Sequence, residues 1–179
     1  MPASDAIIGV LAIGDVPKDA LKVVAAHITG YLNLKTEILP SLAHPSYAYD
    51  SRRQQYDAGI IISTLETTLI HDQEKIIGVL TVDLFVPIFT YVFGEAREGG
   101  RYGVVSMHRL GERSSKRKQM LPQTLERTAK VALHELGHLF NRVHCQDSHC
   151  IMHFAGRLED LDKTPPYFCK YCAAVLPRL

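Results

Sequence analysis

The sequence predicts an α/β fold in which packed helices cover a twisted, mostly parallel sheet with one antiparallel strand at its edge. Three observations support this prediction. Short apolar runs, typical of buried strands, alternate with segments of helical periodicity. One glycine-rich reversal favours a hairpin, which would supply the antiparallel strand. The chain has 179 residues, 46% of them hydrophobic and 22% charged, which is enough for one compact domain with its own core.

The first elements follow directly from the apolar pattern. Residues 7–13 form a continuous apolar run, as in a strand that is buried on both faces. Pro17 then suits a first helical turn, and Gly30 is the predicted end of the helix. Between them, apolar residues recur at helical spacing, namely Leu21, Val24, Ala25 and Ile28. Residues 36–39 predict a second strand, and residues 40–50 predict a loop.

Residues 51–69 fit either a helix or a strand. A helix would place Tyr56, Ile60 and Leu65 on one face, although the three consecutive isoleucines are β-branched. We interpret the segment as a helix, because a crossover is needed before the next parallel strand. That strand is predicted at residues 75–82, which again form a continuous apolar run.

The second half of the chain predicts a hairpin and a long helix. Residues 89–93 and 102–107 flank a segment containing Gly99-Gly100, which favours a tight reversal. Residues 109–118 are rich in Arg and Lys, and we interpret them as a solvated loop, with a phosphate or acidic partner as the alternative. A helix is then predicted from residue 123 to 140, where an apolar stripe consists of Leu125, Ala129, Ala132, Leu133, Leu136 and Phe140.

The most informative motif lies on this last helix and just after it. It consists of His134-Glu135-x-x-His138 and a third histidine, His144. Residues four apart share a helical face, so two imidazoles at this spacing can bind one zinc ion. Three protein ligands leave a fourth position for water, which is typical of a catalytic site. Glu135 is then the predicted general base that takes a proton from this water, the alternative being an ordinary charge on the helix surface.

This pattern resembles the metzincin signature, in which a third histidine and a Met-containing turn follow H-E-x-x-H. Cys145 directly after His144, together with the later cysteines, resembles one branch of that clan, the archaemetzincins. Asn141 stands where the signature has glycine. Because asparagine is the next most tolerant residue of a left-handed backbone, we expect the turn to be retained.

The resemblance implies an upper metzincin-like unit at residues 1–144, with the active-site helix, and a lower unit at residues 145–179. It also implies that Met152 packs beneath the zinc without binding it. Some metzincins carry a tyrosine two residues after this methionine that supports the transition state. Phe154 stands there in this chain, so another group must do this work or the stabilisation is weaker.

The four cysteines have the spacings C-x4-C and C-x-x-C, and both pairs can bind one metal ion. They could instead form disulfides or be independent core residues, and His149 or His153 could replace one sulfur. We predict a structural zinc site at Cys145, Cys150, Cys169 and Cys172. With the catalytic site, the chain would bind two zinc ions. A short helix carrying the last two cysteines is expected at the C-terminus.

The predicted function is a zinc-dependent metallopeptidase that acts on a peptide or protein. A non-catalytic zinc-binding module and a zinc amidohydrolase acting on a non-peptide amide are the alternatives. Whether it trims termini or cuts inside chains is open, and Glu95 and Glu98 are the candidates for holding a substrate ammonium. A net charge of +1 gives no case for nucleic acid or membrane. Without a recognisable signal peptide, we expect a cytoplasmic protein, and a monomer by default.

Overall fold

The structure is a computed structural model that describes residues 6–69, 71–111 and 122–177. Its main sheet consists of β1 (Ile7–Ala12), β2 (Lys35–Ile38), β5 (Lys75–Leu80), β7 (Gly94–Ala96) and β8 (Tyr102–Ser106). The strand order is β2-β1-β5-β8-β7. All neighbours pair in parallel except β7, which is antiparallel to β8 at the edge. The predicted fold class, a mostly parallel sheet with one antiparallel edge strand, is therefore confirmed.

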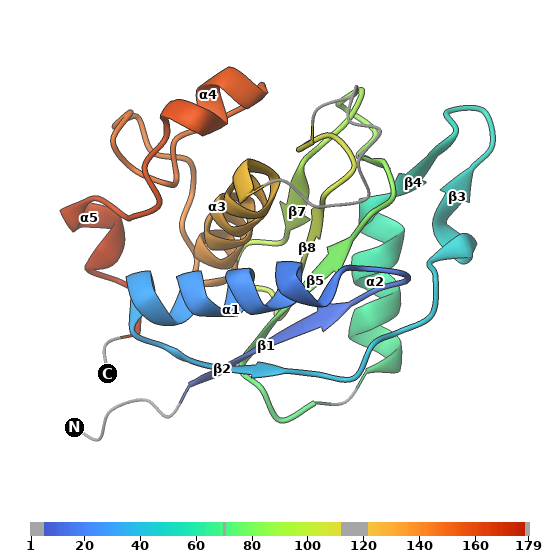
Figure 1. Ribbon diagram of the computed structural model, residues 1–179, viewed down its shortest axis with the longest axis horizontal. Coiled ribbons are helices and arrows are strands. Elements are labelled where there is room, and N and C mark those ends of the chain that lie inside the picture. Colours follow the sequence, from blue (N-terminus) through green and yellow to red (C-terminus); the bar gives the residue numbers. More distant parts are fainter. Residues whose placement is uncertain (1–5, 70, 112–121, 178–179) are drawn as a thin grey trace.

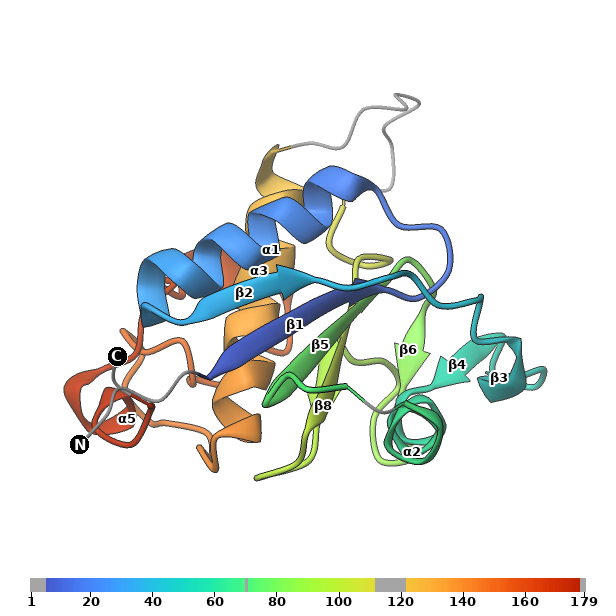
Figure 2. The same cartoon turned by 90° about the horizontal axis from the view of Figure 1, so that it is seen from below.

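Helices cover both faces of this sheet (Figures 1 and 2). On one face lie α1 (Lys18–Leu32) and α3 (Pro122–Leu139), and on the other lies α2 (Ala58–Thr68). Two hydrophobic clusters result, because each face of the sheet buries its own set of side chains. Val10 and Ile77 belong to the cluster beneath α1 and α3, whereas Leu11 and Ile76 belong to the cluster beneath α2. The site described below lies where α3 meets β7.

Helix α1 begins where the sequence predicts it, directly after Pro17. It does not end at Gly30, however, but continues to Leu32. Asn33 ends the helix with a left-handed backbone, and its N–H donates to the carbonyl oxygen of Thr29. The predicted end was wrong because a glycine inside the last turn costs a helix little compared with the packing of its apolar face.

The interpretation of residues 51–69 as one helix was wrong in its first part. Residues 49–57 form β3 (Tyr49–Asp50), a turn and β4 (Gln55–Asp57). The helix α2 begins only at Ala58, where the side chain of Asp57 accepts the N–H of Ile60 and caps it. The predicted face was also wrong, because Ile60 is exposed while Ile61 and Ile62 are buried.

The predicted hairpin is present, but its first arm is β7, a little later than residues 89–93. Those earlier residues belong to a connecting loop at residues 86–93. A second, small sheet of order β3-β4-β6, in which β6 is Leu84–Phe85, lies behind this loop. Gln55 donates from its side chain to the carbonyl oxygen of Thr90, and Arg53 donates to those of Phe89 and Pro87. These hydrogen bonds attach the loop to the small sheet.

After α3 the chain wraps around the end of this helix and forms α4 (Leu158–Lys163) and α5 (Lys170–Ala173) (Figure 1). The Arg127 guanidinium on α3 binds Asp162 of α4 through two short hydrogen bonds of 2.6 and 2.7 Å. Lys130, also buried on α3, donates to the carbonyl oxygens of Leu161 and Asp162. These contacts fix α4 against α3. The predicted C-terminal helix is α5, but it begins directly after Cys169, so it carries Cys172 and has Cys169 only as its N-cap.

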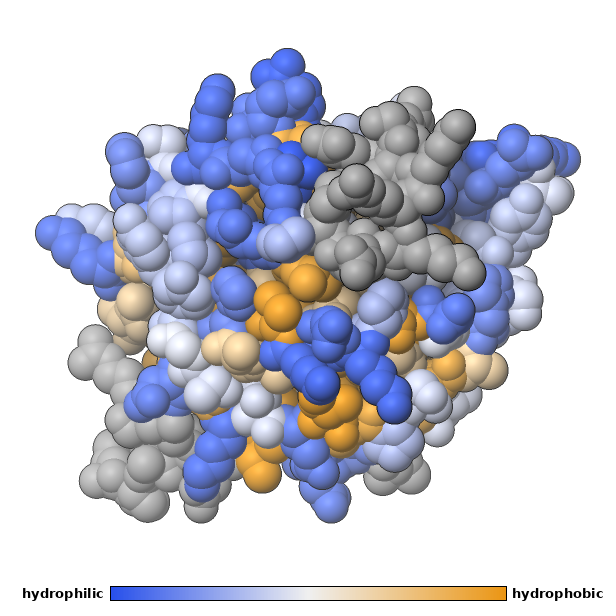
Figure 3. All heavy atoms as spheres, in the orientation of Figure 1, coloured by the Kyte–Doolittle hydropathy of each residue, from blue (hydrophilic) through white to orange (hydrophobic). Residues whose placement is uncertain are grey.

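The outer surface carries few further signals. On the face that α1 crosses, hydrophobic side chains gather mainly in the middle, among hydrophilic ones (Figure 3). Of the basic stretch 109–118, Arg109 pairs with Asp83, while residues 112–118 lie outside the described residues. Within the ranges 6–69, 71–111 and 122–177, no helix is both long and apolar enough to cross a bilayer. The cytoplasmic location stays a prediction.

Candidate active site

Helix α3 supplies the first part of the site, and the turn after it supplies the rest. His134, Glu135 and His138 lie in the last two turns of α3. The helix then ends in a Schellman motif: the N–H of Arg142 donates to the carbonyl oxygen of Gly137, and that of Asn141 to His138. Asn141 has the left-handed backbone this motif needs, with φ of 61°. The turn expected at this non-glycine position is therefore present, and it brings the chain back to His144.

The three predicted histidines lie around one point. Their ring centroids are 4.8, 5.1 and 5.0 Å apart, so they form a nearly equilateral triangle. The Nδ1 atom of His134 lies 2.7 Å from the carbonyl oxygen of Ile151, and that of His138 lies 2.6 Å from that of Arg142. Because a carbonyl oxygen only accepts, both Nδ1 atoms carry the proton. Both Nε2 atoms therefore present lone pairs.

These lone pairs face each other, with the two Nε2 atoms 3.1 Å apart. Neither neutral ring can donate to the other in this arrangement, so the contact is repulsive unless a cation is shared. Two ligand nitrogens about 2.0–2.1 Å from one tetrahedral zinc would be separated by about 3.3 Å, close to the observed value. The ligand atoms of His134, His138 and His144 all lie within 4.8 Å of one another. The residues present thus fit a zinc ion.

The electrostatics of the imidazoles agree with this fit. Burial, and to a lesser extent the nearby His138, lower the pKa of His134 to about 3. Burial also lowers the pKa of His138 and of the more exposed His144. The rings are accordingly neutral at physiological pH, which is the form that binds metals.

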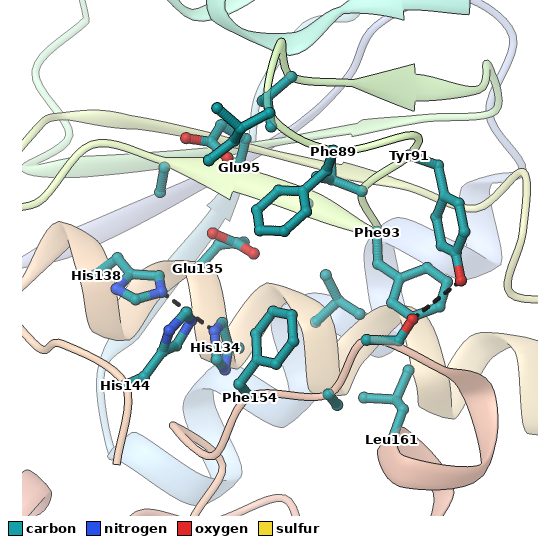
Figure 4. Close-up of a pocket in the computed structure, with 18 of the residues that line it drawn as sticks. Phe89, Tyr91, Phe93, Glu95, His134, Glu135, His138, His144, Phe154 and Leu161 are labelled. Carbon is teal, nitrogen blue, oxygen red and sulfur yellow. Dashed lines mark hydrogen bonds between the residues drawn. The ribbon is translucent and has the colours of Figure 1, made fainter.

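Glu135 is buried against the edge strand rather than exposed on the helix surface. Burial raises the pKa of its carboxyl well above the ordinary value, and the charge of Glu95 on β7 raises it further. Gly94 makes the close approach possible, because a Cβ atom there would lie 2.7 Å from Oε1 of Glu135. Figure 4 shows the carboxylate between the histidines and Glu95. A carboxylate with a raised pKa is a stronger base.

Met152 is completely buried and lies beneath α3 at Gly137. A Cβ atom at Gly137 would overlap the sulfur of Met152 and would lie 3.0 Å from Cε1 of Phe168. The backbone of the Met-containing turn is tied to the preceding segment, since Cys145 donates its N–H to the carbonyl oxygen of Met152. The methionine therefore supports the histidines from below without facing the cavity.

The four predicted cysteines also come together. Their sulfur atoms all lie within 4.8 Å of one another, and those of Cys145 and Cys169 are 3.9 Å apart. All four are free thiols, so the disulfide alternative does not describe this structure. Sulfurs about 2.3 Å from one tetrahedral zinc would be about 3.8 Å apart, which agrees with the observed pair. His149, by contrast, is exposed and lies beside Asp147.

The protonation of these thiols is uneven. Backbone N–H groups of Cys172 and Tyr171 lower the pKa of Cys169, whereas burial raises the pKa of Cys150 and Cys172. A thiolate is thus favoured at Cys169, at the beginning of α5. A nearby cation would favour ionisation of the buried Cys150 and Cys172 thiols, so the cluster fits a structural metal ion as well.

A cavity of about 790 Å³ lies next to the histidines and Glu135. The loop at residues 86–93 and strand β7 form one wall, and the segment after the Met-containing turn forms the other, together with α4 (Figure 4). Its lining is largely apolar and includes Phe89, Phe93, Val131, Ile151, Phe154 and Leu161. Of the two acidic candidates, Glu95 lines the cavity, whereas Glu98 is exposed.

Comparison with known proteins decides the family. The model of peptidase family M54 matches residues 15–178. The chain belongs to this family, the archaemetzincins. It is 35% identical to the archaemetzincin of Methanopyrus kandleri over 85% of this chain and 83% of the relative, and 33% identical to that of Thermococcus kodakarensis over 96% of each.

Solved structures of archaemetzincins agree. The crystal structure of the Methanopyrus kandleri protein superposes with a TM-score of 0.84 at 31% identity, over 98% of this chain and 96% of that one. That of the Archaeoglobus fulgidus protein, complexed with malonate, has a TM-score of 0.79 at 28% identity, over 94% and 99%. As an archaemetzincin, the protein is a zinc-dependent metallopeptidase.

Sequence reasoning missed several residues of this archaemetzincin site. Gly94 lies in close contact with Glu135, and Gly137 with Met152. An isolated glycine within a strand or a helix often indicates such a close approach, so the sequence contained a signal for both. The contribution of α4, which lines the cavity with Leu161, carried no such signal. Helix α4 is only six residues long, and its place depends on contacts with α3 that are distant in sequence.

Proposed function

We propose that the protein hydrolyses peptide bonds at a zinc ion held by His134, His138 and His144, with Glu135 as the general base. One observation carries this proposal. The Nε2 lone pairs of two neutral imidazoles, those of His134 and His138, face each other beside a buried carboxylate, and a cavity large enough for a peptide lies next to them. The zinc, when bound, would polarise the substrate carbonyl and make a water molecule more acidic.

The chain's own residues perform the proton transfers. Glu135 takes a proton from the attacking water as its oxygen adds to the peptide carbonyl carbon, and then gives this proton to the leaving nitrogen as the C–N bond breaks. Its raised pKa, caused first by burial and then by Glu95, suits both roles. No hydroxyl stands at position 154, where Phe154 instead packs with its ring centroid 5.2 Å from that of His144.

The substrate would lie extended along residues 91–95, which comprise the end of the 86–93 loop and the first two residues of β7. These residues all line the cavity, and within the described residues β7 pairs with β8 on one side only. An unpaired edge offers main-chain donors and acceptors that hold an extended peptide. A complex in which a peptide-like inhibitor lies away from this edge would contradict the placement.

The second metal ion is assigned to Cys145, Cys150, Cys169 and Cys172. This site would join the segment after His144 to the C-terminus, and so would define residues 145–179 as a lower unit beneath residues 1–144. Its role is structural, because four thiolates leave no position for water. Met152 lies between Cys150 and Cys169 in sequence and would support the histidine site by packing.

The experiment is to compare the wild type with Glu135→Gln in peptide-library cleavage. The variant should lose nearly all hydrolysis while it retains its zinc content and its fold, because only the base is removed. Glu126→Gln is a matched control, since Glu126 lies on the same helix but is exposed. Retention of more than about a tenth of the activity by Glu135→Gln would contradict general-base catalysis by this residue.

A further inference from the structure

Two contacts join the walls of the cavity, and the one made by Tyr91 lies away from the histidines. The Tyr91 hydroxyl donates to the carbonyl oxygen of Gly156 across the cavity, over 3.0 Å. The rings of Phe89 and Phe154 stack across it as well, with their centroids 6.4 Å apart and an interplanar angle of 26°. Figure 4 shows Tyr91 away from the histidine group, with Phe89 and Phe154 facing each other in between. We call these four residues the clasp.

Side chains of the small sheet hold the loop that carries Phe89 and Tyr91 in place. Arg53 donates to the carbonyl oxygens of Phe89 and Pro87, and Gln55 donates to that of Thr90. The loop that carries Phe89 and Tyr91 is therefore attached at several points to the small sheet β3-β4-β6. It cannot swing out of the way of a substrate without breaking these bonds.

The ring of Tyr91 is fixed separately. The guanidinium carbon of Arg109 lies 4.3 Å from the centre of this ring. Arg109 itself binds Asp83 through two hydrogen bonds of 2.7 Å each, and Gln55 donates to the same carboxylate. Arg109, the first residue of the basic stretch, therefore has defined contacts, whereas the sequence predicts a solvated loop there.

The opposite wall, which carries Phe154 and Gly156, is also anchored. Gly156 lies just before α4, which α3 holds through Arg127 and Lys130 as described above. Both walls are thus attached to the rest of the fold, and the Tyr91 hydrogen bond spans the space between them. An extended peptide that passes the histidines toward Phe93 reaches this bond, because Phe93 and Tyr91 line the same cavity.

We propose that the clasp closes one end of the substrate cleft, so that Tyr91 limits how many substrate residues extend beyond the scissile bond on that side. The inference rests on the proposed peptidase function and specifies its substrates as peptides cut near one terminus. A longer segment fits only if the Tyr91–Gly156 hydrogen bond and the Phe89–Phe154 contact are broken. Such a segment loses affinity and is cleaved more slowly.

The test uses two peptide series built on one cleavable sequence and lengthened by single residues, at the N-terminus only or at the C-terminus only. Binding is measured in the Glu135→Gln protein by calorimetry, so that it does not depend on turnover. Cleavage is measured in the protein with Glu135 intact. Each is repeated with Tyr91→Phe, which removes only the hydroxyl. Tyr31→Phe is the matched control, because Tyr31 is a half-exposed tyrosine on α1 and does not line the cavity.

We expect affinity and kcat/KM to fall sharply beyond a fixed length in one series and not in the other. Tyr91→Phe should raise the ratio of long to short peptide by about tenfold, which corresponds to about 1.4 kcal/mol and to one hydrogen bond. Tyr31→Phe should leave the ratio unchanged. The proposal is overturned if both series bind equally at every length, if no peptide binds, or if Tyr91→Phe keeps the wild-type limit.

The two proposals fail separately. Cleavage by Glu135→Gln, or its absence in the protein with Glu135 intact, would refute the proposed catalysis. The length dependence of binding would still decide the role of the clasp.

Discussion

Replacement of Gly137 by alanine tests how tightly Met152 supports the histidine site. The new Cβ atom would overlap the Met152 sulfur and would lie 3.1 Å from Met152 Cε and 3.0 Å from Phe168 Cε1. Met152 is completely buried, so its side chain cannot move out into solvent. Overpacking of this kind costs about 1–3 kcal/mol.

Gly30→Ala provides the matched control. Gly30 also lies inside a helix, α1, but nothing lies within 4 Å of the position its Cβ would take. Alanine gains up to about 1 kcal/mol of helix propensity at either position, so the difference between the variants isolates the packing cost.

Gly137→Ala should therefore be less stable than Gly30→Ala by about 1–3 kcal/mol, or about 2–12 °C in Tm. The assay is thermal and denaturant unfolding, with peptide cleavage as a second readout. Because the displaced methionine lies under the histidine site, cleavage should fall in Gly137→Ala only. Equal stability and equal activity of the two variants would refute the close packing of Met152 against the helix.

Two further predictions concern the metal sites. Mild chelation should remove activity and one zinc while the protein stays folded. Cys169→Ser should instead lower both Tm and total zinc, because binding of a structural zinc contributes on the order of 10 kcal/mol to folding. A Cys169→Ser protein as stable as the wild type would count against the second site. In the metal-free protein, burial lowers the folded-state pKa of His134 to about 3. The unfolded chain therefore binds more protons than the folded chain below pH about 6.5, the ordinary pKa of histidine. The free energy of unfolding should accordingly fall as the pH drops below about 6.5. The slope between pH 6.5 and 5 should be smaller in His134→Ala, and equal slopes would contradict the depressed pKa.

The parts of the fold with strong local signals were predictable from the sequence. The apolar runs at β1 and β5 and the stripe on α3 identify the buried elements, because burial on both faces of a sheet leaves a continuous apolar pattern. The HExxH spacing likewise placed two of the clustered imidazoles on one helical face. The third histidine depended on a turn at Asn141, which the resemblance supplied.

The parts set by distant pairing were not predictable. Strand β4 exists because it pairs with β6 nearly 30 residues later, with Tyr56 opposite Leu84, and no local pattern shows this. The clasp depends in the same way on contacts such as that between Tyr91 and Gly156, which are 65 residues apart. The helix was wrongly extended over residues 51–57 because a crossover was expected there, and tertiary pairing of β4 decided otherwise.

The location of the metal ions tests the central claim most directly. A crystal of the protein, with diffraction data collected above and below the zinc absorption edge, would show every bound zinc as a peak of anomalous density. We predict two peaks per chain, one among the Nε2 atoms of His134 and His138 and the ring of His144, and one among the four cysteine sulfurs. A zinc-loaded, active protein with no peak at the three histidines would contradict the proposed catalytic site.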